Sequence, residues 1–337
     1  IKYLLKNSKK KINVDLNKYL FFAAIATVCD QMPLRNINKK IVINGFKNFQ
    51  YNKFVNLKKL LKINHRLKTS DISFSLGPIL NSAGRLGYSD LPIRLLIEKK
   101  DVIVDKITNK LLILNEKRKK IQNNTINLLN SKRDENKSKV IFKYKENINE
   151  GLLGIIAAKY VDIYNKPSFI LTNSGNYIKC SSRSINGYDI GNIFYYAFKK
   201  KIIIKGGGHS MAGGCTLKKN KLNEFNEFLN IYFNKKFKSY EKFKYYISEQ
   251  NLDSLVKFSK KDFQCLEPLG NSNNNPFFIV KGNKVVKAKI IRDAHLQLVI
   301  KNKNKSCVCF AFNSVGTKLG DLLMNYKKEI ALIVQIN

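Results

Sequence analysis

One long helical pattern in the first half of the chain constrains the fold more than any other feature. Apolar residues recur at helical spacing across residues 102–129, lysines flank them, and the pattern ends in the polar run 131–138. The chain has 337 residues, which is too many for one ordinary core. The pattern therefore predicts a long helix that bridges two domains. The Lys-Arg-Lys-Lys stretch at 117–120 is interpreted as part of its solvated basic face.

The segments on both sides of this helix are predicted to be α/β structure. Residues 1–98 alternate short apolar runs with helical patterns, and a helix is expected at 91–97, where Ser89 and Asp90 are good N-cap residues. On the C-terminal side the pattern predicts strands at 140–144, 168–172 and 201–205 and helices at 154–164 and 221–233. The strand at 201–205 is expected to lead into a glycine run.

The last hundred residues change character. Residues 238–276 are interpreted as a connector that ends in the loop GNSNNNP at 270–276. From Phe277 the pattern is all β, with the runs FFIV, VVKAKII, LQLVI and CVCFAF, and it stops at Asn337 in mid-pattern. A small β-barrel, incomplete at its end and with an unpaired edge, is the expectation.

The apolar and cysteine content excludes several classes of protein. The longest apolar run, residues 19–29, is too short to span a bilayer. The six cysteines form no CxxC pair, which favours a reduced, cytoplasmic protein. His65, His209 and His295 have no paired ligand nearby, so no zinc site is expected. The first residue is Ile rather than Met, which suggests a fragment.

The charge of the chain favours a polyanionic partner. There are 62 basic residues against 24 acidic ones, a net charge of +38, and cations that contact phosphates release counterions and so drive binding. The chain is also crowded with Lys, Asn and Ile, so a mutational bias toward A/T-rich codons is an alternative source of the lysines. The few arginines are therefore the better candidates for a bidentate phosphate fork.

The most specific motif is GGGHSMAGG at 206–214. Glycines let a backbone approach a phosphate or ribose closely, and their N–H groups can form an anion nest. Gly207, Gly208 and His209 are the candidate binding residues here, with His209 donating at the mouth. A tight strand-to-helix turn with His209 as a bystander is the alternative.

Two further motifs carry phosphate-type chemistry. In LGPILNSAGRLG, residues 76–87, small side chains bring the backbone close to whatever Asn81 and Arg85 address, although close helix packing with an exposed arginine is the alternative. In KCSSRS, residues 179–184, the hydroxyls of Ser181 and Ser184 surround Arg183 as in a phosphate cradle, although serine-rich loops are common.

Asp30 is the candidate metal ligand. It closes the uncharged run 21–29, and if this run is a helix the dipole at its C-terminus disfavours a carboxylate there. A bound cation would resolve that conflict. A surface position of Asp30 would resolve it too.

In order and spacing, these motifs resemble those of the RecJ exonucleases, which belong to the DHH phosphoesterase superfamily. The resemblance rests on ATVCDQMPL (26–34), LGPILNSAGRLG, EGLLGIIA (150–157), the SSRS loop and GGGHSMAGG, and it covers nearly the whole chain. The loop at 270–276 resembles the entrance of that family's oligonucleotide-binding (OB) barrel. The implied architecture is an α/β fold with five parts. These are the C-terminal part of a DHH catalytic domain (1–98), a bridging helix (99–137), a DHH-associated α/β domain (138–237), a connector (238–276) and an incomplete OB-like barrel (277–337).

The resemblance also implies an activity. It predicts a 5′–3′ exonuclease for single-stranded DNA that acts in DNA repair and recombination and uses two Mn²⁺ or Mg²⁺ ions. By position, Asp30 matches a metal-binding and catalytic residue, His209 a catalytic and substrate-binding residue, and Arg85, Ser181 and Arg183 residues that hold DNA phosphates. A single-strand-binding protein or a helicase is an expected partner, the chain is expected to be a monomer, and no membrane is implied.

The departures from the family pattern define what this chain is expected to lack. The Asp-His-His triplet and the upstream Asp-rich motif appear nowhere, so the remaining metal ligands are expected before Ile1 and the chain alone is expected to be inactive. Ile79 replaces an arginine, Asn149 a histidine, Ser182 a glycine and Gly213 an alanine. None of these changes removes Asp30 or the phosphate-type arginines.

Two other functions stay open. One is a DHH-family oligoribonuclease or nucleotide phosphatase, which the expected barrel argues against. The other is a nucleic-acid-binding relative without catalysis, or an editing-type module. All four motif elements should converge on one cleft if the exonuclease interpretation is right, so Asp30, Arg85, Arg183 and His209 are expected to lie together.

Overall fold

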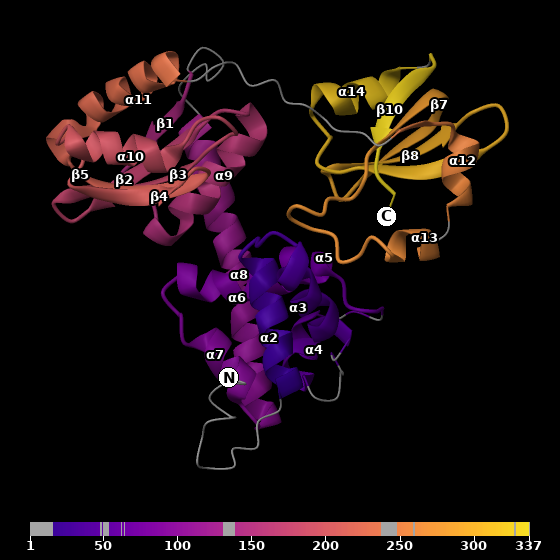
Figure 1. Ribbon diagram of the computed structural model, residues 1–337, viewed down its shortest axis with the longest axis horizontal. Coiled ribbons are helices and arrows are strands. Elements are labelled where there is room, and N and C mark those ends of the chain that lie inside the picture. The colour runs from indigo at the N-terminus through magenta and orange to yellow at the C-terminus, as the bar shows by residue number, and fades with distance from the viewer. Residues whose placement is uncertain are drawn as a thin grey trace. The chain divides into compact units, whose positions relative to one another are not determined.

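The computed structural model (Figure 1) describes residues 16–47, 49, 54–61, 63, 65–130, 139–236, 248–258, 260–326 and 328–336. The chain divides into a first unit, residues 1–49, 66–72 and 243–337, and a second unit, residues 50–65 and 73–242. Each unit contains one five-stranded sheet among its described residues. Within the described ranges, every helix is too short or too polar to span a bilayer.

The N-terminal part of the first unit is helical. α2 (Leu16–Cys29) packs against α3 (Asn36–Lys47), and α5 (Thr69–Asp71) follows later in the chain. A Cβ at position 45 would come within 2.6 Å of the Ala24 Cβ and 2.9 Å of the Leu20 carbonyl oxygen. Glycine at position 45 therefore allows the close approach of α2 and α3.

The α/β alternation expected across residues 1–98 is not present in the part of it that the structure describes. From residue 16 to residue 97 the described elements are helices only. A short apolar run is compatible with either a strand or a buried helix face, and here packing between helices decides the outcome.

The C-terminal part of the first unit is an open, curled sheet, drawn in orange and yellow in Figure 1. Its strand order is β10-β7-β8-β9, and β6 pairs in parallel with β7. The strands are β6 (Ser248–Gln250), β7 (Phe278–Ile291), β8 (His295–Lys301), β9 (Ser306–Ala311) and β10 (Ile330–Val334). The fully buried side chains of β8, Leu296, Leu298 and Ile300, alternate with half-buried ones and line its inner face.

This sheet confirms the expected partial OB-like barrel with an unpaired edge. Among the described residues no strand pairs with the outer edge of β9, so the sheet does not close. The runs FFIV and VVKAKII are one 14-residue strand rather than two, because the chain passes through Gly282 without turning back. The expected connector contributes β6 to the sheet, together with the helices α12 (Leu252–Lys257) and α13 (Lys260–Gln264). α14 (Lys318–Asn325) packs on β7.

The second unit begins with helices gathered on one long helix. α4 (Val55–Leu61), α6 (Gly77–Arg85) and α7 (Leu91–Ile97) all contact α8 (Asp101–Asn130), and the π-helix η1 (Ile72–Leu76) leads into α6. The predicted long helix is therefore present as α8, with 30 residues, while its bridging of two domains stays a prediction because α8 lies wholly in the second unit. α7 and α8 are separate helices, and the chain between them passes through Glu98. The Glu98 carboxylate accepts the N–H groups of Lys99 and Lys100 at 2.8 and 3.0 Å.

The expected cap of α7 is wrong in its detail. Asp90 has helical backbone angles and its side chain accepts no capping hydrogen bond. It lies 3.5 Å from Arg94, one turn along the helix, in an exposed ion pair. A carboxylate at this position thus interacts with a side chain rather than with the helix end.

The second sheet has the strand order β1-β2-β3-β5-β4, with β1 and β2 parallel and the other pairs antiparallel. Its strands are β1 (Ile141–Tyr144), β2 (Ser168–Ser174), β3 (Tyr177–Arg183), β4 (Lys205–His209) and β5 (Ala212–Lys218). After the 3-10 turn η2 (Glu150–Leu152), α9 (Leu153–Tyr164) packs on β2 and β3 and buries Ile170. Phe169 and Leu171 point to the other face, in a core shared with α10 (Ile190–Lys199) and α11 (Leu222–Lys236).

The glycine run is itself a strand, which corrects the predicted strand at 201–205. β4 begins at Lys205, runs through Gly206, Gly207 and Gly208, turns at residues 210–211 and returns as β5. Ile202 and Ile203 are buried but lie outside any strand. Glycine weakens a strand taken alone, and here pairing with β5 supplies the missing stability.

Candidate functional site

The glycines of this hairpin serve two different faces of the sheet. A Cβ at Gly213 would come within 2.8 Å of Ile190 and Phe194 on α10, and one at Gly206 within 2.8 Å of Cys215 and Ile203. Glycine at 213 thus allows α10 to lie close against the sheet, and glycine at 206 leaves room for Ile203 and Cys215. A Cβ at Gly207, in contrast, would meet nothing within 4 Å. No neighbouring atom therefore requires glycine at position 207, and its lack of a side chain leaves the opposite face of the sheet bare.

This bare side of the sheet is called the open face below. Paired residues of antiparallel strands point to the same side, so the register gives three rows across β3, β5 and β4. The rows are Lys179–Thr216–Lys205, Ser181–Gly214–Gly207 and Arg183–Ala212–His209. All nine residues are exposed or half-buried. Their small central side chains let a ligand lie directly on the backbone, and basic groups stand at both ends.

Arg183 and Ser181 lie where α9 begins. A Cβ at Gly154 would come within 3.0 Å of the Arg183 guanidinium and 3.2 Å of the Ser181 Oγ. The Arg183 guanidinium donates to the Ser182 carbonyl at 2.8 Å, which holds the side chain along the edge of the face. Glycine at 154 thus allows the start of α9 and the two polar side chains to share this corner.

Arg85 approaches the same corner from α6. Its guanidinium donates to the Gly151 carbonyl at 3.0 Å, and a Cβ at Gly151 would come within 2.3 Å of the Arg85 carbonyl oxygen. The end of α6 and the turn η2 are therefore in direct contact. Asn81 is exposed one helical turn before Arg85, on the same side of α6.

Arg118 of α8 completes what we call the arginine cluster, Arg85, Arg118 and Arg183. Burial lowers the pKa of Arg85, and the nearby charges of Arg118 and Arg183 lower this pKa further. Burial also lowers the pKa of Arg118 and Arg183. Guanidinium groups nevertheless stay charged in proteins, so three like charges are held together here.

The charge of the arginine cluster is not neutralised within the described part of the chain. No carboxylate there lies within ion-pair distance of these three side chains. Half-buried positive charges without a carboxylate partner are stabilised by a bound anion, and a planar guanidinium suits a phosphate. The arrangement therefore has the charge and the donor geometry that would suit a phosphate-type anion.

Arg118 was missed by the sequence reasoning, which assigned residues 117–120 to a solvated face. Its guanidinium instead donates to the Asn115 Oδ1 at 2.6 Å and to the Gln122 Oε1 at 3.0 Å. Asn115 is buried, which shows that this stripe of α8 faces the protein. An arginine in a run of lysines, three residues from an asparagine on the apolar stripe, was the signal available.

His209 is exposed at the end of β4. Its Nδ1 accepts a hydrogen bond from the Met211 N–H at 3.3 Å. In a neutral imidazole the other nitrogen, Nε2, then carries the hydrogen and can donate to a ligand. The structure places His209 in the same cross-strand row as Arg183.

Two predicted substrate-binding residues are placed differently. Ser184 is only 4% exposed, and its hydroxyl donates to the Tyr188 carbonyl in the turn that leads to α10. Its polar group is thus engaged within the protein and is not presented to a ligand. Gly208 pairs with Gly213 and belongs to the row that faces α10, so only its backbone edge adjoins the open face.

Asp30 lies in the first unit, at the end of α2. Its N–H donates to the Ala26 carbonyl at 2.9 Å and its side chain is exposed. Burial raises the pKa of the neighbouring Cys29 thiol to about 11, and the charge of Asp30 contributes to the rise. Arg85, Arg183 and His209 belong to the second unit, so their convergence with Asp30 stays a prediction.

The chain that follows Asp30 is held by the loop at 270–276. The Leu34 N–H donates to the Asn271 carbonyl at 2.7 Å, and the Arg35 Nε donates to the Ser272 carbonyl at 3.0 Å. The Asn271 amide donates in turn to the Gln31 carbonyl. The loop expected at the barrel entrance therefore contacts the candidate metal-binding segment.

The described residues do not make up a metal centre. Among them, no group of three or more His, Cys, Asp and Glu side chains is arranged to hold a metal ion. Two divalent cations require more ligands than the carboxylate of Asp30. The described residues alone therefore do not supply the ligands for two-metal catalysis.

Two parts of the chain are similar to known domains, and nearly the whole chain is similar to known proteins. Residues 136–235 match the DHHA1 domain and residues 249–337 match the RecJ OB domain. The single-stranded-DNA-specific exonuclease RecJ of Bacillus subtilis is 25% identical over 316 residues, which cover 88% of this chain and 39% of that protein. The RecJ exonuclease of Thermus thermophilus is 21% identical over 327 residues, 95% of this chain and 46% of that protein.

The fold is also that of a solved structure. The crystal structure of RecJ from Thermus thermophilus in complex with Mn²⁺ superposes with a TM-score of 0.81 at 20% identity, over 95% of this chain and 47% of that one. The chain thus spans less than half the length of these relatives. The expected α/β architecture, with a long helix, a DHH-associated domain and a partial OB-like barrel, is confirmed.

Proposed function

We propose that this chain, a RecJ-type protein with a DHHA1 domain followed by a RecJ OB domain, binds single-stranded DNA through the open face and the arginine cluster. The observation that carries the proposal is a group of three arginines, free of carboxylate partners in the described chain, beside a sheet face bare of large side chains. In the whole protein this part would serve a 5′–3′ exonuclease in DNA repair and recombination.

The residues of the site have separable roles in this proposal. Arg85 and Arg183 bind a phosphate, and the Ser181 hydroxyl and the Nε2 of His209 donate hydrogen bonds to the same strand. Gly207 and Gly214 let the sugar and base approach the sheet closely. Fixing the strand in this way is the positioning part of catalysis.

We propose Mn²⁺ or Mg²⁺ as the cofactor, with Asp30 as one ligand. The metals would supply an activated water and stabilise the leaving oxygen. Partner proteins such as a single-strand-binding protein or a helicase, a monomeric state and a cytoplasmic location are proposals of the same kind.

The two alternatives are weighed by different observations. A DHH-family oligoribonuclease or nucleotide phosphatase is disfavoured by the RecJ OB match and by the half-barrel it covers. A nucleic-acid-binding protein without catalytic activity would bind DNA through the same open face, so this face does not distinguish it from the exonuclease. A nuclease assay on the whole protein separates this alternative from the exonuclease.

Binding is tested by the change Arg183→Ala. Loss of a charge-assisted phosphate contact should weaken binding of oligo-dT by about 1.5–3 kcal/mol, roughly ten- to a hundredfold in Kd. With roughly four phosphate contacts the log–log salt slope should be near −3, and the change should flatten it by about 0.7. Fluorescence anisotropy at several salt concentrations, in EDTA, measures both quantities.

Arg94→Ala is the matched control, because Arg94 is exposed on α7 and pairs only weakly with Asp90. Equal binding by the Arg183 and Arg94 variants would contradict the assignment. With Mn²⁺, the chain alone is expected to bind a 5′-phosphorylated oligonucleotide without digesting it. Digestion that Asp30→Ala abolishes would show that a full metal site exists within these residues.

A further inference from the structure

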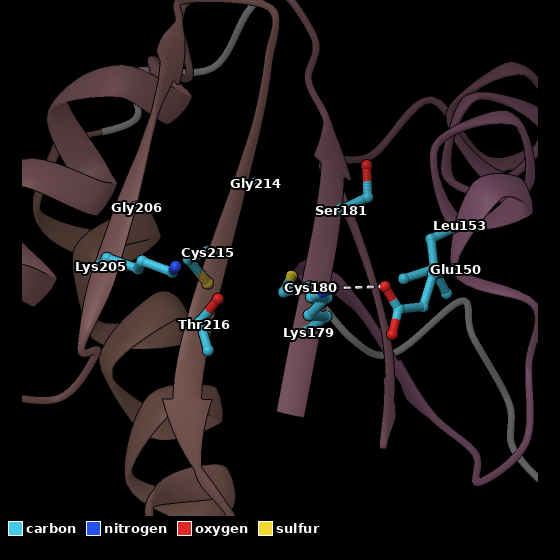
Figure 2. A pocket seen from close by; sticks show the side chains of 10 residues that line it. All are labelled: Glu150, Leu153, Lys179, Cys180, Ser181, Lys205, Gly206, Gly214, Cys215 and Thr216. Carbon is cyan, nitrogen blue, oxygen red and sulfur yellow. Dashed lines mark hydrogen bonds and ion pairs between the residues drawn. The ribbon is translucent and has the colours of Figure 1, made fainter. Parts of the chain in front are cut away.

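The open face continues past Ser181 into a pocket that the proposed DNA contacts reach only at its border. The pocket has a volume of about 500 Å³ and lies over β3, β5 and β4, with the start of α9 on one side (Figure 2). Ser181 and Gly214 form its border with the phosphate-type corner. Its remaining polar side chains are Lys179, Lys205, Thr216 and Glu150.

The row Lys179–Thr216–Lys205 is the neighbour of the Ser181 row, on the side away from Arg183 and His209. Strands rise about 3.3 Å per residue, so adjacent rows on one face are roughly 6.6 Å apart. Lysines from two non-adjacent strands thus flank a hydroxyl, one row beyond Ser181. In Figure 2 the side chain of Lys205 extends from β4 toward β5.

The charges in the pocket are not balanced. The Lys179 Nζ lies 2.5 Å from the Glu150 carboxylate, and this contact lowers the pKa of Glu150. No carboxylate in the described part of the chain pairs with Lys205, which is exposed. Two cations and one anion leave a positive pocket in which Glu150 occupies the position that an anionic ligand of Lys179 would take.

We propose that Lys179, Lys205 and Thr216 form a second phosphate subsite, and that Glu150 is its internal competitor. The inference rests on the proposed binding of single-stranded DNA. The ligand is a phosphate of the bound strand, either a further phosphate on its 5′ end or a backbone phosphate. On binding it takes the place of the Glu150 carboxylate at Lys179.

Removal of a lysine from the subsite and removal of the Glu150 charge should change oligonucleotide binding in opposite directions. Lys205→Met removes an attractive charge and should weaken oligonucleotide binding about five- to tenfold, with a salt slope flatter by about 0.7. Glu150→Gln removes the competitor and should tighten binding about two- to fivefold. A merely structural role for Glu150 would weaken binding or leave it unchanged when the ion pair is lost.

The experiment uses fluorescence anisotropy of the full chain in EDTA, with 3′-labelled oligo-dT that carries a 5′-hydroxyl, a 5′-monophosphate or a 5′-triphosphate. Effects confined to the triphosphate assign the subsite to extra phosphates of the 5′ end. Equal effects on all three assign it to the backbone. Either result supports the subsite.

Lys159→Met on α9 and Glu227→Gln on α11 are the matched controls. These substitutions change the charge as Lys205→Met and Glu150→Gln do, and both side chains are exposed and lie outside the pocket. The subsite is overturned if Lys205→Met behaves as Lys159→Met does with every oligonucleotide, or if Glu150→Gln fails to tighten binding beyond its control. If Arg183→Ala still weakens binding in that case, the proposed function survives alone. Absence of binding by the unaltered chain would overturn both.

Discussion

The contribution of each arginine in the arginine cluster to ligand binding depends on the residues around it. Arg118 stands among lysines on α8, yet its charge, together with that of Arg183, lowers the pKa of Arg85. Its two hydrogen bonds, to Asn115 and Gln122, fix the guanidinium on the helix that α6 packs against. A fixed charge loses little entropy when it contributes to ligand binding.

The change Arg118→Met should therefore weaken binding of single-stranded DNA about three- to tenfold, roughly 1 kcal/mol, because it removes part of the positive potential at the site. Anisotropy titrations measure the change. Lys117→Met alters the same charge one residue away on the exposed side of α8 and should stay within about twofold of the unaltered chain. If the two variants weaken binding equally, only net charge matters and Arg118 has no specific place in the site.

Sequence reasoning reached part of this site and missed part of it for physical reasons. Arg85, Ser181, Arg183 and His209 stand in short motifs whose unusual residues attract notice without any tertiary information. Arg118 does not, because a lysine-rich helix looks solvated until α6 packs beside it. Ser184 next to Arg183 looked like part of a cradle, yet a local turn uses its hydroxyl.

Among the elements, the β4–β5 hairpin separates stability from binding most clearly. Gly213→Val places atoms within 2.8 Å of Ile190, Phe194 and the Gly207 carbonyl, so α10 must move and the chain should lose about 1–3 kcal/mol of stability. Gly207→Val meets open space and should leave stability within about 0.5 kcal/mol. It should nevertheless weaken DNA binding, because the new side chain covers the open face.

Chemical denaturation and anisotropy, applied to both variants, check this pair of expectations. The informative result is the difference in stability between the Gly213 and the Gly207 variant. Unfolding of the Gly207 variant at a markedly lower denaturant concentration would mean that Gly207 is also required for packing. Undiminished DNA binding by that variant, with stability intact, would remove the open face from the proposed interface.

The same hairpin shows where element prediction works and where it stops. α8, α9 and α11 carry apolar residues at helical spacing, and β1 and β2 carry short β-rich runs, so their existence could be predicted from local pattern. β4 has three glycines in five residues and no strand pattern of its own. Its conformation comes from pairing with β5 and from the approach of α10, which no local pattern reveals.

For the whole molecule, the open question is whether Asp30 faces the arginine cluster. If it does, its carboxylate repels a bound phosphate in the absence of metal. Asp30→Asn should then tighten binding of single-stranded DNA in EDTA by about two- to fivefold, which corresponds to roughly 0.4–1 kcal/mol. Asp162→Asn removes a carboxylate exposed on α9 and should have no effect of this size.

Equal behaviour of these two variants would place Asp30 away from the bound strand. The arginine cluster would then be an anion site without a metal position beside it. This result would favour the alternative function, a protein that binds nucleic acid without catalysis. Tighter binding by the Asp30 variant alone, matched by the unaltered chain when Mn²⁺ is added, would support the convergence of the two units.

The hydrogen bonds between the segment after Asp30 and the loop at 270–276 have a consequence for synthesis. Arg35 and Ser272 are 237 residues apart in sequence, and Asn271 and Gln31 are 240 apart. On a ribosome, the whole of the second unit emerges between the two halves of these contacts. Contacts of such long range form late and slowly. The segment that follows Asp30 therefore stays without its loop partners until residues 270–276 have emerged, and during this interval its backbone groups are open to other chains and to chaperones.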